Sequence, residues 1–161
     1  MLRVIKRNLL YSVDTFLVHQ CNSVTNRAAH LAAAVFEAFP HSDIYYNRQK
    51  ADPLGTAIVV PSLSGFCIDD SLRPVAALIA QRYPGPSKRI DDTPRHRLRW
   101  FKEALKSLGE QCDHIVDGVS SVPSYAFPWR IGCGAAGGNW DEYMELLLEF
   151  SSERSVTIYK L

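Results

Sequence analysis

The fold of the chain is decided by one stretch, Phe127-Pro128-Trp129-Arg130-Ile131-Gly132-Cys133-Gly134-Ala135-Ala136-Gly137-Gly138-Asn139-Trp140. It places four glycines within seven residues, after an apolar strand-like run and before a helix predicted for residues 141–152. Glycine allows positive φ and lets a ligand approach the main chain closely. A helix N-terminus offers unpaired N–H groups and a favourable dipole to an anion. We therefore expect a phosphate- or diphosphate-binding loop, with a simple tight connection as the alternative.

The loop matches neither of two well-known phosphate motifs. No Lys-Ser or Lys-Thr follows the glycines, which excludes a Walker loop. A place late in the chain does not suit a dinucleotide fingerprint, which opens a βαβ unit. Asp141 and Glu142 suit the helix dipole by themselves and would partly oppose a bound phosphate.

Length and composition indicate one globular domain that spans residues 1–161. The chain is 47% hydrophobic and 22% charged, with a net charge of +1, which gives no global indication of a nucleic-acid or membrane partner. No apolar run reaches the length that spans a bilayer. The basic start, residues 1–10, is too short in its apolar part for a secretory signal, so we expect a strand there, with an organelle-targeting signal as the alternative. We expect an intracellular protein, cytoplasmic or, as the alternative, nuclear.

The cysteines and histidines form no recognisable ligand or disulfide pattern. Four cysteines, Cys21, Cys67, Cys112 and Cys133, are far apart and include no CxxC pair. Two disulfides are conceivable, but reduced cysteines are expected in a domain of this size without a signal peptide. Neither these cysteines nor the five histidines have the spacing of metal ligands, so we expect no metal and no cofactor.

Strand-like and helix-like segments alternate along the chain. Strands are predicted at residues 3–5, 15–21, 56–60, 75–80, 114–119, 122–127 and 156–159. Helices are predicted at residues 27–39, from Asp92-Thr93-Pro94 onward, and at 141–152. This alternation predicts an α/β sheet covered on both faces. Ligands of such sheets bind at the carboxyl ends of strands, where the glycine loop and the segment after residues 15–21 both fall.

Apolar spacing predicts which helix faces are buried. The first helix is apolar nearly all round and should be deeply packed. The second should bury residues at helical spacing, namely Leu98, Phe101, Leu105 and Leu108. The third should bury Trp140, Met144, Leu147 and Leu148.

A second polar segment, His19-Gln20-Cys21-Asn22-Ser23-Val24-Thr25-Asn26-Arg27, lies where a strand stops and a helix begins. The Asn22 amide both donates and accepts, so it can hold a sugar hydroxyl; the alternative is that Asn22 caps a turn. For His19 a packed core position is favoured, and a near-neutral acid or base is the alternative.

Together, residues 4–10, 18–22, 127–140 and 156–161 resemble a macro domain in order and spacing. The branch resembled contains ADP-ribose 1''-phosphate phosphatases and the terminal ADP-ribose protein glycohydrolase. The most specific pieces are Ile131-Gly132-Cys133-Gly134 and Val156-Thr157-Ile158-Tyr159, and the likeness is weakest over residues 44–72. It implies a three-layer α/β/α fold with a mixed central sheet, and ADP-ribose or a derivative as ligand.

The resemblance also implies residue roles. Asn8 would contact adenine, Asn22 the distal ribose, and the N–H groups of residues 132–138 the diphosphate, with residues 23–27 as the other wall. The implied ligand-binding set is Asn8, Cys21, Asn22, Thr25, Arg27, Gly132, Cys133, Gly134, Ala135, Ala136, Gly137 and Gly138. Phe127 and Tyr159 are expected in the core, with a place beside a ligand ring as the alternative.

The departures from the pattern bear on catalysis. The glycohydrolase lysine and aspartate match Gln81 and Ala136, which supply neither a lysine adduct nor an acid–base carboxylate. His19 matches the histidine of phosphatase-type members, so the resemblance implies His19 and Asn22 as catalytic residues. Arg27 would neutralise a second anionic group, or else is a solvated residue at a helix start.

Two functions therefore stay open. The favoured one is a hydrolase acting at the distal ribose of ADP-ribose derivatives, as a phosphatase or by removing ADP-ribose from a carrier; the alternative is a non-catalytic reader. We expect a monomer, no membrane partner, and as further candidate partners an ADP-ribosylated protein or nucleic acid. The basic residues of 88–102 are expected on a solvated helix face rather than on a carrier, and Trp100 and Phe101 in packing.

Overall fold

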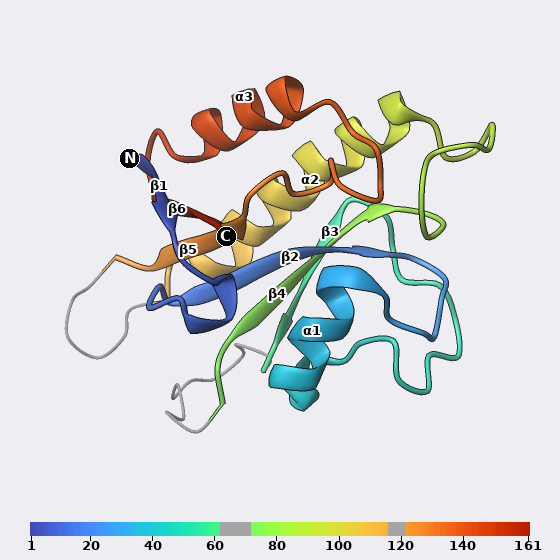
Figure 1. The fold of residues 1–161 in the computed structure, drawn as a ribbon, viewed down its shortest axis with the longest axis horizontal. Coiled ribbons are helices and arrows are strands. Elements are labelled where there is room, and N and C mark those ends of the chain that lie inside the picture. Colours follow the sequence, from blue (N-terminus) through green and yellow to red (C-terminus); the bar gives the residue numbers. More distant parts are fainter. Residues whose placement is uncertain (62–71, 116–121) are drawn as a thin grey trace.

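The computed structural model describes residues 1–61, 72–115 and 122–161, and within them six strands form one sheet in the order β1-β6-β5-β2-β4-β3 (Figure 1). The strands are β1 (Leu2–Lys6), β2 (Phe16–Asn22), β3 (Thr56–Val60), β4 (Val75–Gln81), β5 (Ser124–Pro128) and β6 (Ser155–Lys160). The helices are α1 (His30–Ala38), α2 (Pro94–Cys112) and α3 (Trp140–Phe150), with short 3-10 turns η1 (Leu9–Tyr11) and η2 (Pro40–Ser42).

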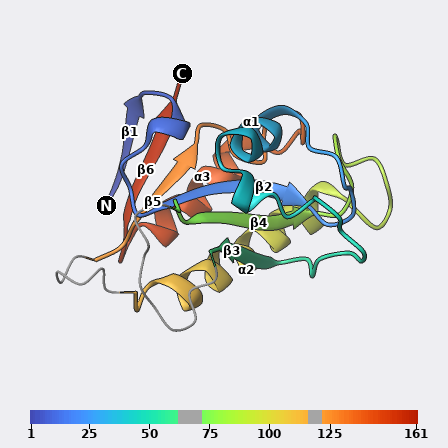
Figure 2. The same cartoon turned by 90° about the horizontal axis from the view of Figure 1, so that it is seen from below.

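The sheet is mixed and covered on both faces, as predicted. Strands β1, β6, β5, β2 and β4 run parallel to their neighbours, and β3 pairs antiparallel with β4 at one edge. Figure 2 shows α1 on one side of the sheet and α2 on the other. Alternate residues of β2 enter separate cores: Phe16 and Val18 pack with α2 and α3, whereas Leu17 and Cys21 pack with α1 and η1. The three-layer α/β/α fold is therefore confirmed.

Helix α1 differs most from its prediction. It begins at His30 rather than at residue 27, and only Val35 and Phe36 are buried. Leu31 is 37% exposed, so the prediction of deep packing was wrong. The physical reason is that the first turn of α1 does not lie on the sheet but forms one wall of a cavity.

The other helices follow the apolar pattern more closely. Thr93 caps α2, which confirms the predicted helix start, and His96 completes a capping box. Phe101, Leu105 and Leu108 are buried, and Leu98 is half-buried. The buried residues of α3 are Tyr143, Leu147 and Phe150, so the prediction for Leu147 is confirmed, while Trp140 and Met144 are partly buried against the core. Leu148 is 52% exposed, because it lies one residue beyond the buried face, so its predicted burial was wrong.

The basic stretch is solvated with one exception. Its charged side chains lie on the surface at Lys88, Arg89, Arg95, Arg99 and Lys102. Arg97 is buried, because a buried carboxylate and three carbonyl groups take up its donors; here the solvated-face prediction was wrong. Trp100 and Phe101 pack in the core, as expected.

The strand predicted at residues 114–119 and one of the four cysteines fall partly or wholly outside the described residues. Residues 116–119 of the strand predicted at 114–119 lie outside the described residues, and His114 and Ile115 belong to no strand. Cys21, Cys112 and Cys133 are free and buried, whereas Cys67 lies outside the described residues. Within the described ranges, no helix combines the length and apolarity needed to cross a membrane. Nor do His, Cys, Asp or Glu side chains of those ranges gather in a group of three or more that would hold a metal ion.

Candidate functional site

A cavity of about 300 Å³ opens at the carboxyl ends of β2, β4 and β5. The strand ends contribute Gln20 and Asn22 from β2, Gln81 from β4 and Pro128 from β5. The glycine loop forms a second wall and the first turn of α1 a third. The two segments that the sequence placed at strand ends therefore meet at one site, where open α/β sheets bind their ligands.

The part of the glycine loop that lines this cavity has unused N–H groups. Turn hydrogen bonds occupy the N–H groups of Ile131, Cys133, Gly137 and Gly138. Four other N–H groups donate to no acceptor among the described residues, and the residues that carry them all line the cavity: Gly132, Gly134, Ala135 and Ala136. Successive free N–H groups of this kind form a nest for an anion.

Two of the glycines are required by the path of the loop. Gly132 has φ +72°, and a Cβ there would lie 2.5 Å from Cε1 of Tyr143 and 2.8 Å from Oε1 of Gln20. A Cβ on Gly138 would lie 2.6 Å from the Gly132 carbonyl oxygen. At Gly134 a Cβ would meet no atom within 4 Å, so this position is open to the cavity.

The wall formed by the first turn of α1 contributes a positive electrostatic potential. Ala29 is the N-cap of α1 and provides no side-chain hydrogen bond, so the first turn keeps its free N–H groups and the positive end of its dipole. Residues 29–32 line the cavity, and so do Arg27 and Arg130. Among the lining residues that the structure describes, none is Asp or Glu, so the cavity suits an anion.

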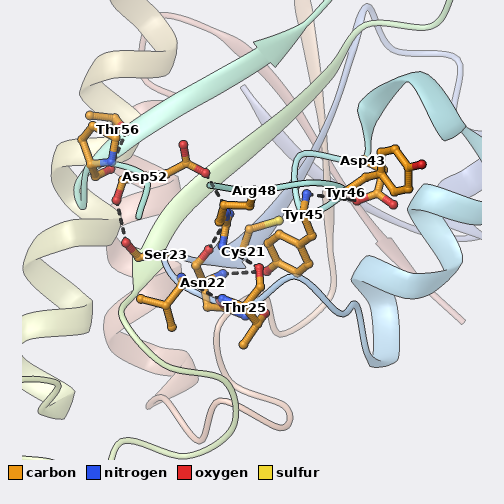
Figure 3. Close-up of polar contacts among 12 residues, drawn as sticks. Cys21, Asn22, Ser23, Thr25, Asp43, Tyr45, Tyr46, Arg48, Asp52 and Thr56 are labelled. Atoms are coloured by element: carbon orange, nitrogen blue, oxygen red, sulfur yellow. Dashed lines mark hydrogen bonds and ion pairs between the residues drawn. The ribbon is translucent and has the colours of Figure 1, made fainter. Parts of the chain in front are cut away.

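Asn22 is held by its own loop (Figure 3). Its Oδ1 accepts hydrogen bonds from Val24 N at 3.1 Å, from Thr25 N at 2.9 Å and from the Thr25 hydroxyl at 3.0 Å. Its Nδ2 donates to no group among the described residues, and Asn22 lines the cavity. The capping interpretation is thus correct for Oδ1, while the two N–H groups of Nδ2 are left for a ligand.

A pair of glutamine amides lies beside Asn22. Gln20 Nε2 donates to Gln81 Oε1 at 2.8 Å, and Gln81 Nε2 donates to the Tyr83 carbonyl at 2.9 Å. Gln20 Oε1 is buried without a partner among the described residues. From the sequence, Gln81 was considered only as the replacement of a lysine and Gln20 was given no role, although Gln20 lies within the polar segment.

An aromatic side chain lies where β5 leads into the glycine loop. Trp129 lines the cavity, its ring 5.1 Å from that of Trp140, and Lys160 Nζ lies 4.5 Å from the ring centroid. Sequence reasoning missed Trp129, although it directly precedes the loop. Phe127 and Tyr159, the candidates for flanking a ring, are buried in the core, as favoured.

Only part of the predicted ligand-binding set comes together. Six members line the cavity: Asn22, Arg27, Gly132, Gly134, Ala135 and Ala136. Six others do not line it: Asn8, Cys21, Thr25, Cys133, Gly137 and Gly138. The Asn8 side chain instead caps η1, accepting from Leu10 N at 2.9 Å. Cys21 and Cys133 are buried, and the Thr25 hydroxyl is used on Asn22.

His19 lies in the core beneath α1 and does not line the cavity. Its ring packs edge-on against Phe36 at 5.5 Å, and its Nε2 lies 3.7 Å from Cys21 Sγ. Burial lowers the pKa of His19 to about 4, so the imidazole is neutral near pH 7. This is the environment of a packed core histidine, and a catalytic role for His19 stays a prediction.

Comparison with known proteins identifies the architecture. No family model and no curated protein sequence matches the chain. Among solved structures, the macrodomain of Mycobacterium tuberculosis DarG is 18% identical with a TM-score of 0.73, and the match covers 100% of this chain and 98% of that one. For the macrodomain of Thermus aquaticus DarG, the identity is 22%, the TM-score 0.69 and the coverage 100% and 99%. Thermosipho africanus DarTG in complex with ADP-ribose is 19% identical with a TM-score of 0.71, over 98% of this chain and 41% of that one. The chain has the macrodomain fold.

Proposed function

We propose that the cavity binds ADP-ribose or a derivative that keeps its diphosphate. The observation that carries this proposal is the set of free N–H groups on Gly132, Gly134, Ala135 and Ala136, which line the same cavity as the uncapped start of α1. A diphosphate places several acceptor oxygens between two such walls. The presence of ADP-ribose in the similar Thermosipho africanus structure supports the same ligand class.

The two ends of the cavity suit the two ends of this ligand. The amides of Gln20, Asn22 and Gln81 both donate and accept, which matches the hydroxyl groups of a ribose. Trp129 offers an aromatic face to a flat purine ring. The ligand would then lie with its adenine near Trp129 and its distal ribose near Asn22.

The side chains of the cavity support binding without chemistry best. Among its described lining residues, none is Asp, Glu, Lys or Cys, which are common sources of acid–base or nucleophilic groups. His19, the catalytic candidate, lies in the core. We therefore infer a reader of ADP-ribose. Hydrolysis at the distal ribose is the second candidate, favoured by one observation: His30 lines the cavity.

The binding proposal is tested by calorimetric titration with ADP-ribose, with ADP and AMP as controls. We expect micromolar binding of ADP-ribose and weaker binding of both controls. Gly134→Glu should weaken binding roughly 30-fold or more, since a carboxylate beside a diphosphate adds like-charge repulsion. Gly134→Ala is the matched control, because a Cβ there has room. Equal affinity of Gly134→Glu and wild type would remove the loop from the site.

The choice between reader and hydrolase needs a turnover assay. Phosphate release from ADP-ribose 1''-phosphate, and release of ADP-ribose from a modified protein, would each be followed for wild type and His30→Gln. Turnover that is lost in His30→Gln while ADP-ribose affinity is kept would establish the hydrolase. Tight binding with no turnover of either substrate would establish the reader.

A further inference from the structure

The irregular segment 43–52, between η2 and β3, is hydrogen-bonded to the turn that begins at Asn22, the last residue of β2 (Figure 3). Tyr45 Oη accepts a hydrogen bond from Asn22 N at 2.8 Å. Arg48 Nη2 donates to the Asn22 carbonyl at 3.2 Å, and Arg48 Nη1 donates to the Thr25 carbonyl at 2.9 Å. The two residues thus hold both ends of the turn made by residues 22–25.

Arg48 is itself fixed in place. Only 4% of its side chain is exposed, and its Nη2 lies 2.8 Å from Asp52 Oδ2. Its guanidinium carbon lies 4.5 Å from the centroid of the Tyr45 ring. A buried, paired and stacked guanidinium holds its donors in a fixed plane, which a flexible ammonium does not do.

Two hydrogen bonds between Ser23 and Asp52 add to this link between segment 43–52 and the turn. Ser23 Oγ donates to the Asp52 carbonyl at 2.6 Å, and Asp52 N donates to the Ser23 carbonyl at 3.0 Å. The turn around Asn22 is therefore held on one side by β4, where Ser23 N donates to the Gln81 carbonyl at 2.9 Å, and on the other by segment 43–52.

This arrangement leaves Nδ2 of Asn22 as the free end of a rigid assembly. The turn N–H groups hold Oδ1, and Tyr45 and Arg48 hold the main chain of the turn. Binding a ligand hydroxyl through Nδ2 then costs little ordering entropy, because the amide is already oriented.

We propose that Tyr45 and Arg48 are positioning residues that orient Asn22 and so determine the preference of the cavity for ADP-ribose over ADP. This inference rests on the proposed function, because it assigns the distal ribose to the Asn22 end of the cavity. ADP shares the adenine and diphosphate with ADP-ribose but lacks the distal ribose. ADP affinity therefore measures only the contacts with adenine and diphosphate.

The test is calorimetric titration of Arg48→Met and Tyr45→Phe with ADP-ribose and with ADP. We expect ADP-ribose affinity to fall roughly tenfold in each variant, because a misoriented Asn22 loses its hydrogen bond to the distal ribose. One such hydrogen bond contributes on the order of 1 kcal/mol. ADP affinity should stay within about twofold of wild type. Arg154→Met is the matched control: it removes an Arg–Asp pair of 2.7 Å, with Asp113, away from the cavity. It should leave both affinities unchanged.

A double-mutant cycle separates positioning from general support. If Arg48 acts through Asn22, Arg48→Met should have no further effect on ADP-ribose affinity in an Asn22→Ala background. Arg48→Lys should restore part of the preference, since it keeps the charge beside Asp52. Equal losses for ADP and ADP-ribose, or additive losses in the cycle, would overturn the inference. Tyr45 itself lines the cavity, so Tyr45→Phe, which removes one oxygen atom, is measured in the Asn22→Ala background as well, and it keeps the test available if Arg48→Met does not fold. A wild-type protein that binds neither ligand would instead contradict the proposed function, and the inference with it.

Discussion

Gly132 and Gly134 lie in the same loop, but the space around their α-carbons differs. Gly132→Ala should destabilise the fold by about 1–3 kcal/mol, since a non-glycine residue is strained at positive φ and its Cβ would meet Tyr143 at 2.5 Å. Gly134→Ala should change stability by less than about 0.5 kcal/mol, because no atom lies within 4 Å. Urea unfolding of both variants measures the difference. Equal stability of the two would contradict this description of the loop.

His19 makes stability depend on pH in a defined direction. Burial lowers its pKa in the folded state to about 4, from an ordinary value of 6.5. The unfolded chain therefore takes up the proton first as pH falls, and the stability contributed by the neutral form is lost between pH 6.5 and 4. The loss amounts to roughly 3 kcal/mol.

His19→Leu removes this titration. Between pH 6.5 and 4.5, the unfolding free energy of wild type should fall more than that of His19→Leu. The difference between the two falls should be on the order of 2 kcal/mol. Urea unfolding at several pH values provides the comparison. Parallel pH dependence in the two proteins would show that His19 is not held neutral in the folded state.

At the scale of elements, Arg97 joins α2 to two loops of the site. Its guanidinium pairs with Asp92 through contacts of 2.7 and 2.6 Å. It also donates to the carbonyl groups of Tyr83, Gly85 and Ala136 at 3.2, 2.6 and 3.2 Å. Burial by itself would raise the pKa of Asp92, but hydrogen bonds from Arg97 and from main-chain N–H groups, together with the Arg97 charge, outweigh it and hold that pKa below the usual value.

Arg97→Met should destabilise the protein by about 3–5 kcal/mol, because it leaves the Asp92 carboxylate buried without its cation. It should also lower the affinities for ADP and ADP-ribose to a similar degree, since Ala136 belongs to the proposed diphosphate loop. Arg99→Met, two residues along the helix with a side chain 61% exposed, is the control and should change stability little. Denaturant unfolding and calorimetry measure both effects. A stable Arg97→Met with normal binding would contradict the anchoring role.

Helix α1 and Arg97 show what periodicity leaves undetermined. An apolar pattern indicates which residues avoid water on average, but it does not say whether a sheet or a cavity lies opposite, so the predicted deep packing of the first helix was wrong and Leu31 is exposed. A row of basic residues likewise does not reveal that Arg97 has a buried carboxylate five positions earlier in the sequence. Both differences arise from tertiary partners that local sequence does not encode.

At the scale of the molecule, the order of strands and helices and the two strand ends that form the site were predictable. These features could be predicted because their signals are local: strong apolar runs, boundaries at proline and glycine, and the glycine loop. The contacts of Tyr45 and Arg48 were not predictable, because they join an irregular segment to a loop 23 and 26 residues away in sequence. The side-chain contact of Asn8 was not predictable either: its Oδ1 accepts a hydrogen bond from Leu10 N and caps η1, and its adenine contact stays a prediction.

Ligand binding should be visible in the stability of the whole molecule, because a ligand that binds only the folded state stabilises it by mass action. At an ADP-ribose concentration of 100 times Kd the gain is about 2.7 kcal/mol, which raises Tm by roughly 5–10 °C in a domain of this size. The same concentration should hardly change the Tm of Gly134→Glu, while the Tm of Gly134→Ala should rise as much as that of wild type. The gain requires no change in the core, since the cavity lies at strand ends that the fold already orders. A wild-type shift reproduced fully in Gly134→Glu would place the ligand elsewhere on the molecule, and the free N–H groups of the glycine loop would then need another partner.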